Sequence, residues 1–346
     1  MKPVLLIFAL FLAASCRPGE LRAGERIDLL VIAPHPDDEV LIAGGRISQT
    51  IARGGRVAVI LVTNGDYTCE RDGYQREAES IAALTFLGVK QSDVHFLGYP
   101  DGALRKLSST PLGPVEFRDA TGECIARTST WADRTAGRID EHTQRTGKPA
   151  EWTSDAIVGD LAALLQRLQP VEVALPHGID DHPDHAMTYV YFRRALDTLK
   201  TAPMIVHRGV VHAGPCWPST CQTYFTPDAV MPPLPSPLFA YLPSERLEID
   251  AQQKLAMIAF YRSQTESDDA TTNWLSSFAR KDEITFPERY ERRVDRWVQV
   301  GSHSRDANTR VLDTGDGFVE FNRWSPEGLF MESEVRPLSS SQSTSQ

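Results

Sequence analysis

The sequence lacks the hallmarks of several common protein classes. It has no run of lysine or arginine that could follow a nucleic-acid backbone, and its 46 acidic residues outnumber its 36 basic residues, so we expect no nucleic-acid partner. No Gly-x-Gly-x-x-Gly or Walker sequence follows the first apolar run of strand length, which argues against a dinucleotide or nucleotide cofactor. No Cys-x-x-Cys pair is present, so a cysteine-rich zinc site is not expected either.

Long apolar runs are also rare, and the clearest one, residues 4–12, stands at the start of the chain. It follows Lys2 and precedes three small residues, an arrangement that predicts an export signal over residues 1–15; a buried N-terminal strand or helix is the alternative. The next residue is Cys16, and residues 13–16 resemble a bacterial lipobox. We therefore expect a lipid anchor at Cys16 in a bacterial cell envelope, with ordinary cleavage and secretion as the alternative because Ala13 replaces the usual leucine.

Cysteine is scarce, and four cysteines remain beyond Cys16. An even number of cysteines in an exported chain suggests disulfides. Cys216 and Cys221 could close a short loop, which would leave Cys69 to pair with Cys124. The other pairings and buried free thiols remain as alternatives.

Apolar runs of strand length alternate with segments of helical periodicity. We expect strands at 27–33, 57–63, 94–97, 171–175 and 204–211, and helices at 40–51, 76–87, 155–168 and 183–199. This alternation predicts an α/β fold, a doubly wound, largely parallel, Rossmann-like sheet with helices on both faces. Ligands of such sheets bind beyond the carboxyl ends of the strands.

Breaks in this pattern suggest the domain organisation. After the signal, residues 16–25 read as a linker, and one domain covers residues 26–282. A polar insertion at 103–152 is expected to border the site and limit which substrates enter, and residues 214–243 form a proline-rich loop. A charged, β-like extension follows at 283–336, and 337–346 should be a disordered tail.

Two clusters of metal-binding residue types stand directly after two of the predicted strands. His35-Pro36-Asp37-Asp38-Glu39 follows the first strand, and His182-Pro183-Asp184-His185 follows the strand at 171–175. Each cluster holds a pair of such residues at i and i+3, a spacing that can place both on one side of a helical turn. Either cluster alone could be a simple turn or a solvated helix start, but the two together favour a shared metal.

The residue types in these clusters suit a catalytic zinc ion. Imidazole and carboxylate are zinc ligands, and three protein ligands plus water form the catalytic arrangement. A leftover carboxylate can take a proton from the water, and a leftover histidine can donate one to a leaving group or stabilise an oxyanion.

The clusters resemble those of the PIG-L / LmbE-like family of zinc-dependent N-acetylglucosamine deacetylases. The resemblance covers about residues 26–265, with gaps at the insertions, and extends to the following segments: Thr63-Asn64-Gly65-Asp66, Arg76 with Glu79, residues 97–102, and Lys254 with Ser263-Gln264. It implies the same fold that the strand pattern predicts.

The resemblance also implies roles for individual residues. Zinc would be bound by His35, Asp38 and His185. Asp37 would be the general base, and His182 would stabilise the tetrahedral intermediate or protonate the amine.

Three more residues receive a role only through this resemblance. Arg76 and Asp101 would hold sugar hydroxyls, although from the residues alone they could equally be an ordinary surface ion pair and a turn residue. Asp184 would orient a histidine, or merely cap a helix. Two positions depart from the family pattern: Tyr261 stands where histidine is frequent, and Asp180 where some members have tyrosine.

We therefore expect an exported, Zn²⁺-dependent hydrolase that removes acetyl from an N-acetylated amino sugar. One alternative is an amidase that cuts a larger acyl group from a thiol-sugar conjugate or glycolipid. The other is a glycan-binding lipoprotein that keeps zinc only for structure, and the presence of Asp37 argues against it because a structural zinc needs no base.

Overall fold

The computed structural model describes residues 26–115, 124–199, 204–235, 244–265 and 270–292, and five short strands farther along, 297–299, 302–306, 309–313, 318–324 and 330–337. The predicted signal, the linker, Cys16 and residues 338–346 of the predicted tail lie outside them. Within the described part of the chain, no helix has both the length and the apolar character that a membrane crossing requires.

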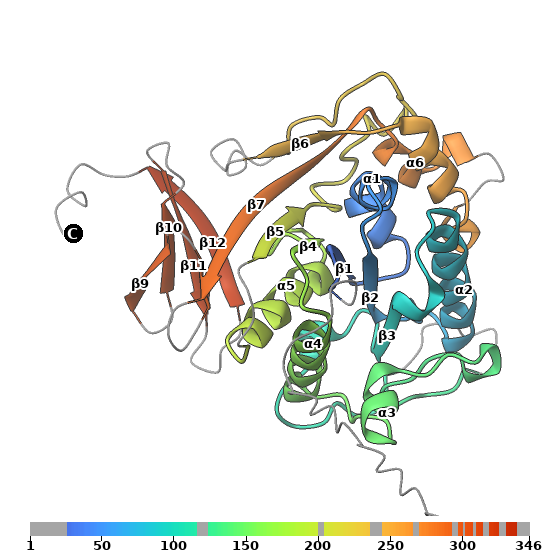
Figure 1. Ribbon diagram of the computed structural model, residues 1–346, viewed down its shortest axis with the longest axis vertical. Coiled ribbons are helices and arrows are strands. Elements are labelled where there is room, and N and C mark those ends of the chain that lie inside the picture. Colours follow the sequence, from blue (N-terminus) through green and yellow to red (C-terminus); the bar gives the residue numbers. More distant parts are fainter. Residues whose placement is uncertain are drawn as a thin grey trace, which may run out of the picture.

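A sheet whose first five strands are parallel forms the centre of the molecule (Figure 1). The parallel strands follow the order β3-β2-β1-β4-β5, with bounds β1 (Leu29–Ala33), β2 (Val57–Thr63), β3 (Val94–Tyr99), β4 (Glu172–Pro176) and β5 (Met204–Gly209). Antiparallel β7 (Asp282–Arg292) pairs with β5, and β6 (Glu245–Glu248) and β8 (Trp297–Gln299) pair with β7. The predicted α/β fold is confirmed.

Helices cover both faces of this sheet. Leu29, Val31 and Ala33 of β1 point into one core, with side chains of α1, α2 and α6, whereas Leu30 and Ile32 point into a second core, with side chains of α4 and α5. This alternation is what a strand buried on both faces requires. The helices are α1 (Asp38–Ala52), α2 (Glu70–Phe86), α3 (Glu141–Thr146), α4 (Ser154–Leu168), α5 (Pro183–Leu196) and α6 (Ala251–Ile258).

The strand order reverses between β1 and β4. From β1 the chain continues outward through β2 and β3, and from β4 it continues in the other direction to β5. At such a point the loops after the two strands diverge and leave a crevice at their carboxyl ends, which is where doubly wound sheets bind ligands. The two predicted metal-binding clusters are these two loops.

The C-terminal part of the chain is β-structured, as its sequence suggests. The predicted domain boundary at 282 coincides with the first residue of β7, so the first strand of the predicted extension belongs to the main sheet. A separate antiparallel sheet has the order β12-β11-β10-β9, with bounds β9 (Ser302–Asp306), β10 (Thr309–Asp313), β11 (Phe318–Trp324) and β12 (Phe330–Pro337).

Candidate metal centre

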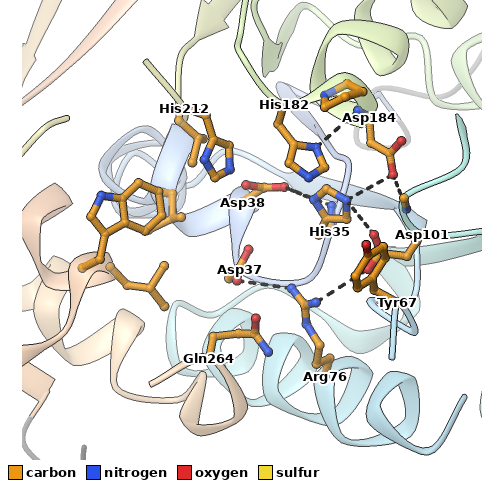
Figure 2. Close-up of a pocket in the computed structure, with 16 residues that line it drawn as sticks. His35, Asp37, Asp38, Tyr67, Arg76, Asp101, His182, Asp184, His212 and Gln264 are labelled. Atoms are coloured by element: carbon orange, nitrogen blue, oxygen red, sulfur yellow. Dashed lines mark hydrogen bonds and ion pairs between the residues drawn. The ribbon is translucent and has the colours of Figure 1, made fainter. Parts of the chain in front are cut away.

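A cavity of about 490 Å³ lies at the carboxyl ends of β1 and β4 (Figure 2). Its lining brings together most of the residues singled out in the sequence: His35, Asp37, Asp38, Arg76, Asp101, His182 and Asp184. His185 lies behind them and is fully buried.

The loop after β1 is held in an unusual backbone conformation. Asp37 has a φ of 119°, a region that residues with a side chain rarely adopt and that is often found at functional sites. Its backbone N–H donates to Glu39 Oε2 at 2.9 Å, and the backbone N–H of Thr63 in β2 donates to Pro34 O at 2.9 Å. The strained turn is therefore fixed on both sides, and α1 begins at the next residue, Asp38.

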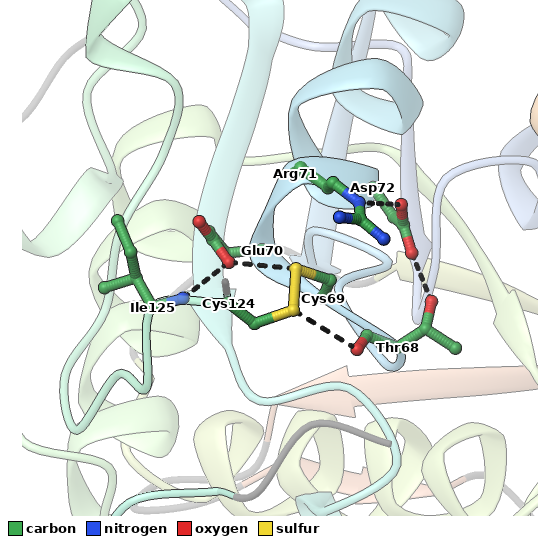
Figure 3. The surroundings of a disulfide bond; sticks show 7 residues. All are labelled: Thr68, Cys69, Glu70, Arg71, Asp72, Cys124 and Ile125. Carbon is green, nitrogen blue, oxygen red and sulfur yellow. Dashed lines mark hydrogen bonds and ion pairs between the residues drawn. A yellow bond between two sulfur atoms is a disulfide. The ribbon is translucent and has the colours of Figure 1, made fainter. Parts of the chain in front are cut away.

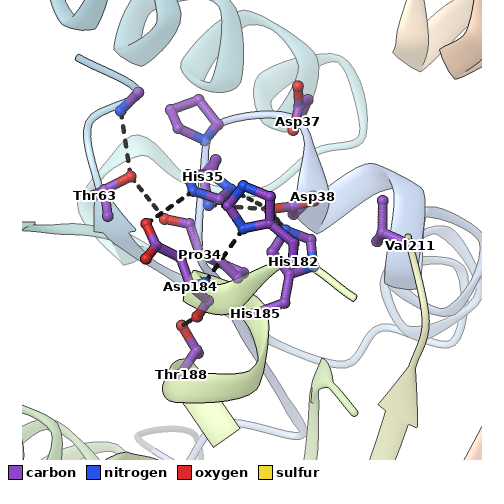
Figure 4. A network of polar contacts seen from close by, with 12 residues as sticks. Pro34, His35, Asp37, Asp38, Thr63, His182, Asp184, His185, Thr188 and Val211 are labelled. Atoms are coloured by element: carbon purple, nitrogen blue, oxygen red, sulfur yellow. Dashed lines mark hydrogen bonds and ion pairs between the residues drawn. The ribbon is translucent and has the colours of Figure 1, made fainter. Parts of the chain in front are cut away.

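Three donor groups meet in an arrangement that fits a metal ion (Figure 4). Asp38 Oδ2 lies 3.1 Å from His35 Nδ1 and 3.1 Å from His185 Nε2. Two donors bound to one tetrahedral zinc at ~2.0–2.1 Å would lie ~3.4 Å apart, so the observed spacing is close to that of a zinc site. Both ring nitrogens of His185 are buried without a well-formed hydrogen bond, which leaves Nε2 available as a ligand.

His182 also comes within reach of these histidines, because ring nitrogens of His35, His182 and His185 all lie within 4.8 Å of one another. However, His182 Nδ1 accepts a hydrogen bond from the backbone N–H of Asp184 at 3.3 Å. His182 is the N-cap of α5, and Pro183 is the first residue of that helix, a position that proline favours. One nitrogen of His182 is thus occupied by capping, whereas Asp38 Oδ2 lies 3.1 Å from a ring nitrogen of each of the other two histidines.

The charges around the histidines prepare the site for a cation. Burial lowers the pKa of His185, but the carboxylates of Asp38 and Asp180 outweigh it and raise the pKa to about 10. Burial also lowers the pKa of His35. Nearby carboxylates, above all that of Asp101, outweigh burial and raise this pKa well above its usual value. The pKa of Asp38 is lowered against burial by the two imidazoles. In the metal-free protein these imidazoles therefore hold protons that a metal would displace.

Asp37 is placed differently from its neighbour Asp38. Burial raises the pKa of Asp37 to about 8, although the Arg76 guanidinium lowers it. Arg76 Nη2 lies 3.3 Å from Asp37 Oδ2 and donates to Pro36 O at 2.9 Å. Asp37 is thus a carboxylate that can hold or release a proton near neutral pH, in the same cavity as the donor set.

Arg76 and Asp101 are buried and line the cavity, so they are not an ordinary surface pair. Asp101 Oδ1 lies 3.1 Å from His35 Nε2, and Arg76 Nη1 lies 3.8 Å from Asp101 Oδ2. Their side chains therefore contact each other as well as Asp37 and His35, and a contact with sugar hydroxyls stays a prediction.

Asp184 joins two loops of the site. Its Oδ2 lies 3.4 Å from His35 Nε2 and accepts from the backbone N–H of Gly102 at 2.7 Å, and its Oδ1 accepts from that of Leu104 at 3.1 Å. The cap of α5 is His182 rather than Asp184, and the role of Asp184 in orienting His35 stays a prediction.

The two departures from the family pattern have distinct places. Asp180 is buried beside the donor set, with Oδ2 at 3.3 Å from His185 Nδ1. The same oxygen accepts from the backbone N–H groups of Val211 at 2.7 Å and His212 at 3.1 Å. Tyr261 is fully buried outside the cavity lining and donates its hydroxyl to Glu39 Oε1 at 2.7 Å.

Sequence reasoning missed three aromatic residues of the cavity lining, Tyr67, His212 and Trp274. Tyr67 lies in the loop after β2 and is exposed. His212 directly follows the predicted strand at 204–211, so the rule that located the two clusters could have found it. Trp274 had no such signal, because it lies in the short 3₁₀ helix Trp274–Phe278 between α6 and β7.

The polar insertion does not border the cavity as expected, since none of its described residues, 103–115 and 124–152, is part of the lining. It packs behind the site instead. Trp131 Nε1 donates to Asp66 Oδ2 at 3.1 Å, and Asn64 Nδ2 donates to Trp131 O at 2.8 Å. Gly98 of β3, with a φ of 71°, permits this packing because a Cβ there would lie 2.0 Å from Trp131 O.

Two disulfides are formed, Cys69–Cys124 and Cys216–Cys221. This is the pairing that we expected if Cys216 and Cys221 close a short loop. The first fastens the insertion to the start of α2 (Figure 3), where Glu70 Oε2 also accepts from the backbone N–H of Ile125 at 2.8 Å.

Comparison with known proteins gives a consistent assignment. The model of the PIG-L family, described as GlcNAc-PI de-N-acetylase, matches residues 30–196. A 1D-myo-inositol 2-acetamido-2-deoxy-alpha-D-glucopyranoside deacetylase of Mycobacterium sp. (strain KMS) is 30% identical over 178 residues, 46% of this chain and 47% of that protein. A protein of the same name from Mycolicibacterium smegmatis is 29% identical over 188 residues, 49% of this chain and 52% of that protein. The chain thus spans about half the length of these relatives.

Among solved structures, the zinc-inhibited form of teicoplanin deacetylase Orf2 is similar with a TM-score of 0.46 and 18% identity, over 81% of this chain and 99% of that chain. The resemblance drawn from the motifs is confirmed by the family model, whose match includes both clusters of candidate ligands. Residues 30–196 are therefore a domain of the PIG-L family.

Proposed function

We propose that the chain is a metal-dependent N-deacetylase that removes acetyl from an N-acetylated amino sugar. The observation that carries this proposal is that Asp37, a buried carboxylate with a pKa of about 8, lines one cavity with His35 and Asp38, two of the three donor groups that meet there. We propose His35, Asp38 and His185 as the ligands of Zn²⁺. When bound, the metal would polarise the amide carbonyl and acidify the attacking water.

Asp37 is the general base of the proposed reaction. It takes a proton from the attacking water, and its raised pKa allows it to keep that proton at neutral pH and pass it to the leaving nitrogen. Arg76, 3.3 Å from Asp37 Oδ2, orients the carboxylate and limits how far its pKa rises.

His182 stabilises the oxyanion rather than protonating the amine. Because Nδ1 accepts from the backbone N–H of Asp184, it carries no proton, and Nε2–H is the donor that remains. Burial, followed by the charges of His35 and His185, lowers the pKa of His182 to about 4. A neutral imidazole that donates a hydrogen bond is suited to a developing negative charge.

The substrate class is inferred from the relatives, whose name specifies a 2-acetamido-2-deoxy-glucopyranoside as their substrate. We further propose that the chain is exported and lipid-anchored at Cys16. The signal-like residues 1–15 support this, and so do two disulfides in the described part of the chain, since disulfides persist in oxidising compartments.

The test is acetate release from a panel of N-acetylated sugars and envelope polymers, with zinc and with a chelator. Asp37→Asn should lower turnover by ~10²–10⁴-fold while zinc content stays at the wild-type level, and Asp38→Ala should lose zinc and activity together. Release of longer acids without acetate would favour the amidase alternative. Full zinc occupancy with no hydrolysis of any substrate would favour the non-catalytic lipoprotein and contradict the proposal.

A further inference from the structure

We propose that Trp274 and His212 form an aromatic wall against which the pyranose ring of the substrate packs, so that the site selects cyclic amino sugars over open-chain acetamides. This inference rests on the proposed deacetylase function and assigns a specificity-determining role to a residue outside the matched segment 30–196.

The wall lies directly beside the metal-binding histidines. The rings of Trp274 and His212 stack with centroids 5.3 Å apart and an interplanar angle of 18°. The His212 ring is in turn 4.9 Å from that of His185 and 5.2 Å from that of His182. Both Trp274 and His212 are half-buried and line the cavity, so a group bound at the metal site would reach this surface.

Trp274 is held in place by the loop that the Cys216–Cys221 disulfide closes. Its Nε1–H donates to Trp217 O at 3.0 Å, and Trp217 lies inside the loop closed by the Cys216–Cys221 disulfide. Phe278 makes T-shaped ring contacts with both indoles, with centroids 5.2 Å from that of Trp274 and 5.8 Å from that of Trp217.

The same loop is fastened a second time, because Arg280 Nη2 donates to Pro218 O at 2.7 Å. With the only polar atom of its side chain bonded to Trp217, the Trp274 indole has only carbon atoms left to offer a ligand. Such a fixed aromatic group loses little conformational freedom when a ligand packs on it, which favours binding.

The cavity has two chemically different sides. Its lining includes the charged side chains of Asp37, Arg76 and Asp101 and the apolar ones of Trp274 and Leu275, and Figure 2 shows His212 across the site from Arg76 and Asp101. A pyranose has the matching distribution, since its hydroxyl and acetamido groups project from the rim of the ring whereas its C–H bonds form apolar faces. An open-chain acetamide has the acetamido group and hydroxyls but no rigid apolar face, so it would gain little from the wall.

The experiment compares one cyclic and one open-chain substrate with the same acetamido group. They are the methyl glycoside of N-acetylglucosamine and the open-chain alditol N-acetylglucosaminitol, which has free hydroxyls at C1 and C5 in place of the methoxy group and the ring oxygen. Packing on one aromatic group contributes ~0.5–1.5 kcal/mol, which corresponds to ~2–12-fold in affinity. Trp274→Ala should therefore raise KM for the glycoside by that factor with kcat nearly unchanged, leave the alditol unaffected, and be largely rescued by Trp274→Phe.

A binding measurement supplies a readout that does not depend on turnover. Calorimetric titration of the glycoside into Asp37→Asn and into the double variant with Trp274→Ala should show the same loss of affinity. Phe86→Ala is the matched control, because Phe86 is an exposed aromatic residue of α2 outside the cavity lining. Zinc content and melting temperature report whether each variant is folded.

The outcomes separate this inference from the proposed function. If wild-type protein hydrolyses the glycoside but Trp274→Ala leaves its KM unchanged, or weakens glycoside and alditol equally, the wall is refuted and the deacetylase function stands. If no acetamide is hydrolysed but glycoside binding depends on Trp274, the deacetylase function fails and the wall stands.

Discussion

Asp180 offers the sharpest test of how the metal site is built. One oxygen lies 3.3 Å from His185 Nδ1 and accepts two backbone N–H groups, those of Val211 and His212. The other accepts the backbone N–H of His182 at 3.0 Å. In Asp180→Asn one of these oxygens becomes an NH₂ group that can only donate. The variant therefore loses an acceptor, and the negative charge that faces His185 disappears.

The size of the effect follows from two opposing consequences. Loss of an outer partner of a metal-bound histidine typically weakens metal binding by ~10–100-fold, or ~1.4–2.8 kcal/mol. The Asp180 carboxylate also helps to hold the pKa of metal-free His185 at about 10 against burial, so its removal makes His185 easier to deprotonate. Easier deprotonation offsets part of the lost zinc affinity, and it does so most at low pH, where protons compete with the metal for His185. We therefore expect a larger loss of zinc affinity at pH 9 than at pH 6.5.

The assay is competition for zinc with a chromophoric chelator at both pH values. Asp155→Asn is the control, since Asp155 is an exposed residue of α4 that pairs with Arg194 at 3.3 Å, and its affinity should stay within about twofold of wild type. If Asp180→Asn, folded by its melting temperature, binds zinc as tightly as the control at pH 9, then Asp180 does not orient His185 and the assignment of that contact is wrong.

Two further predictions concern protons and disulfides. Zinc binding at pH 7 should release protons, because His185, with a pKa of about 10 in the metal-free protein, must lose one to become a ligand. Zinc affinity should therefore rise as the pH approaches 10. Calorimetry in buffers of different ionisation enthalpy measures the release, and finding none would contradict this prediction. Removal of Cys69–Cys124, which bridges a sequence separation of 55 residues, should lower the free energy of unfolding by ~4 kcal/mol. Removal of Cys216–Cys221, with a separation of 5, should lower the free energy of unfolding by only ~2 kcal/mol. Urea denaturation of the two double Cys→Ser variants measures both losses, and equal losses would refute the loop-length argument.

The parts of the site that local sequence rules describe were predictable. His35 and Asp38 meet because they are spaced i, i+3 at a strand-to-helix junction, and they meet His185 because parallel strands end at one edge of the sheet. The partners of these residues were not predictable in the same way. The Asp180 carboxylate, which faces His185, accepts from the backbone N–H of Val211 across 31 residues of sequence, and Trp274 reaches the cavity from a segment without a periodic pattern, so only tertiary packing could place these contacts.

Strand β7 shows why one element of the sheet escaped the hydrophobic pattern. It is rich in charged residues, yet Glu288 is 3% exposed. Its carboxylate lies 2.9 Å from Arg208 Nη1 and 3.8 Å from Arg193 Nη1, and it accepts from Tyr189 Oη at 2.8 Å. Buried charge is tolerated when it is paired and hydrogen-bonded in this way, and a reading based on apolar runs then mistakes a buried strand for a solvated one.

The place of the donor set at the junction of β1 and β4 also links metal uptake to the order of folding. The two loops cannot meet until β4 has docked beside β1, and closing so long a stretch of chain is entropically costly and slow to achieve. A partly folded chain therefore offers a metal ion two separate, weak half-sites. A metal that binds only the complete set stabilises the native state by ~4 kcal/mol when its free concentration is ~1,000 times Kd. The supply of free metal in its surroundings would then set how long the assembled sheet survives before it opens.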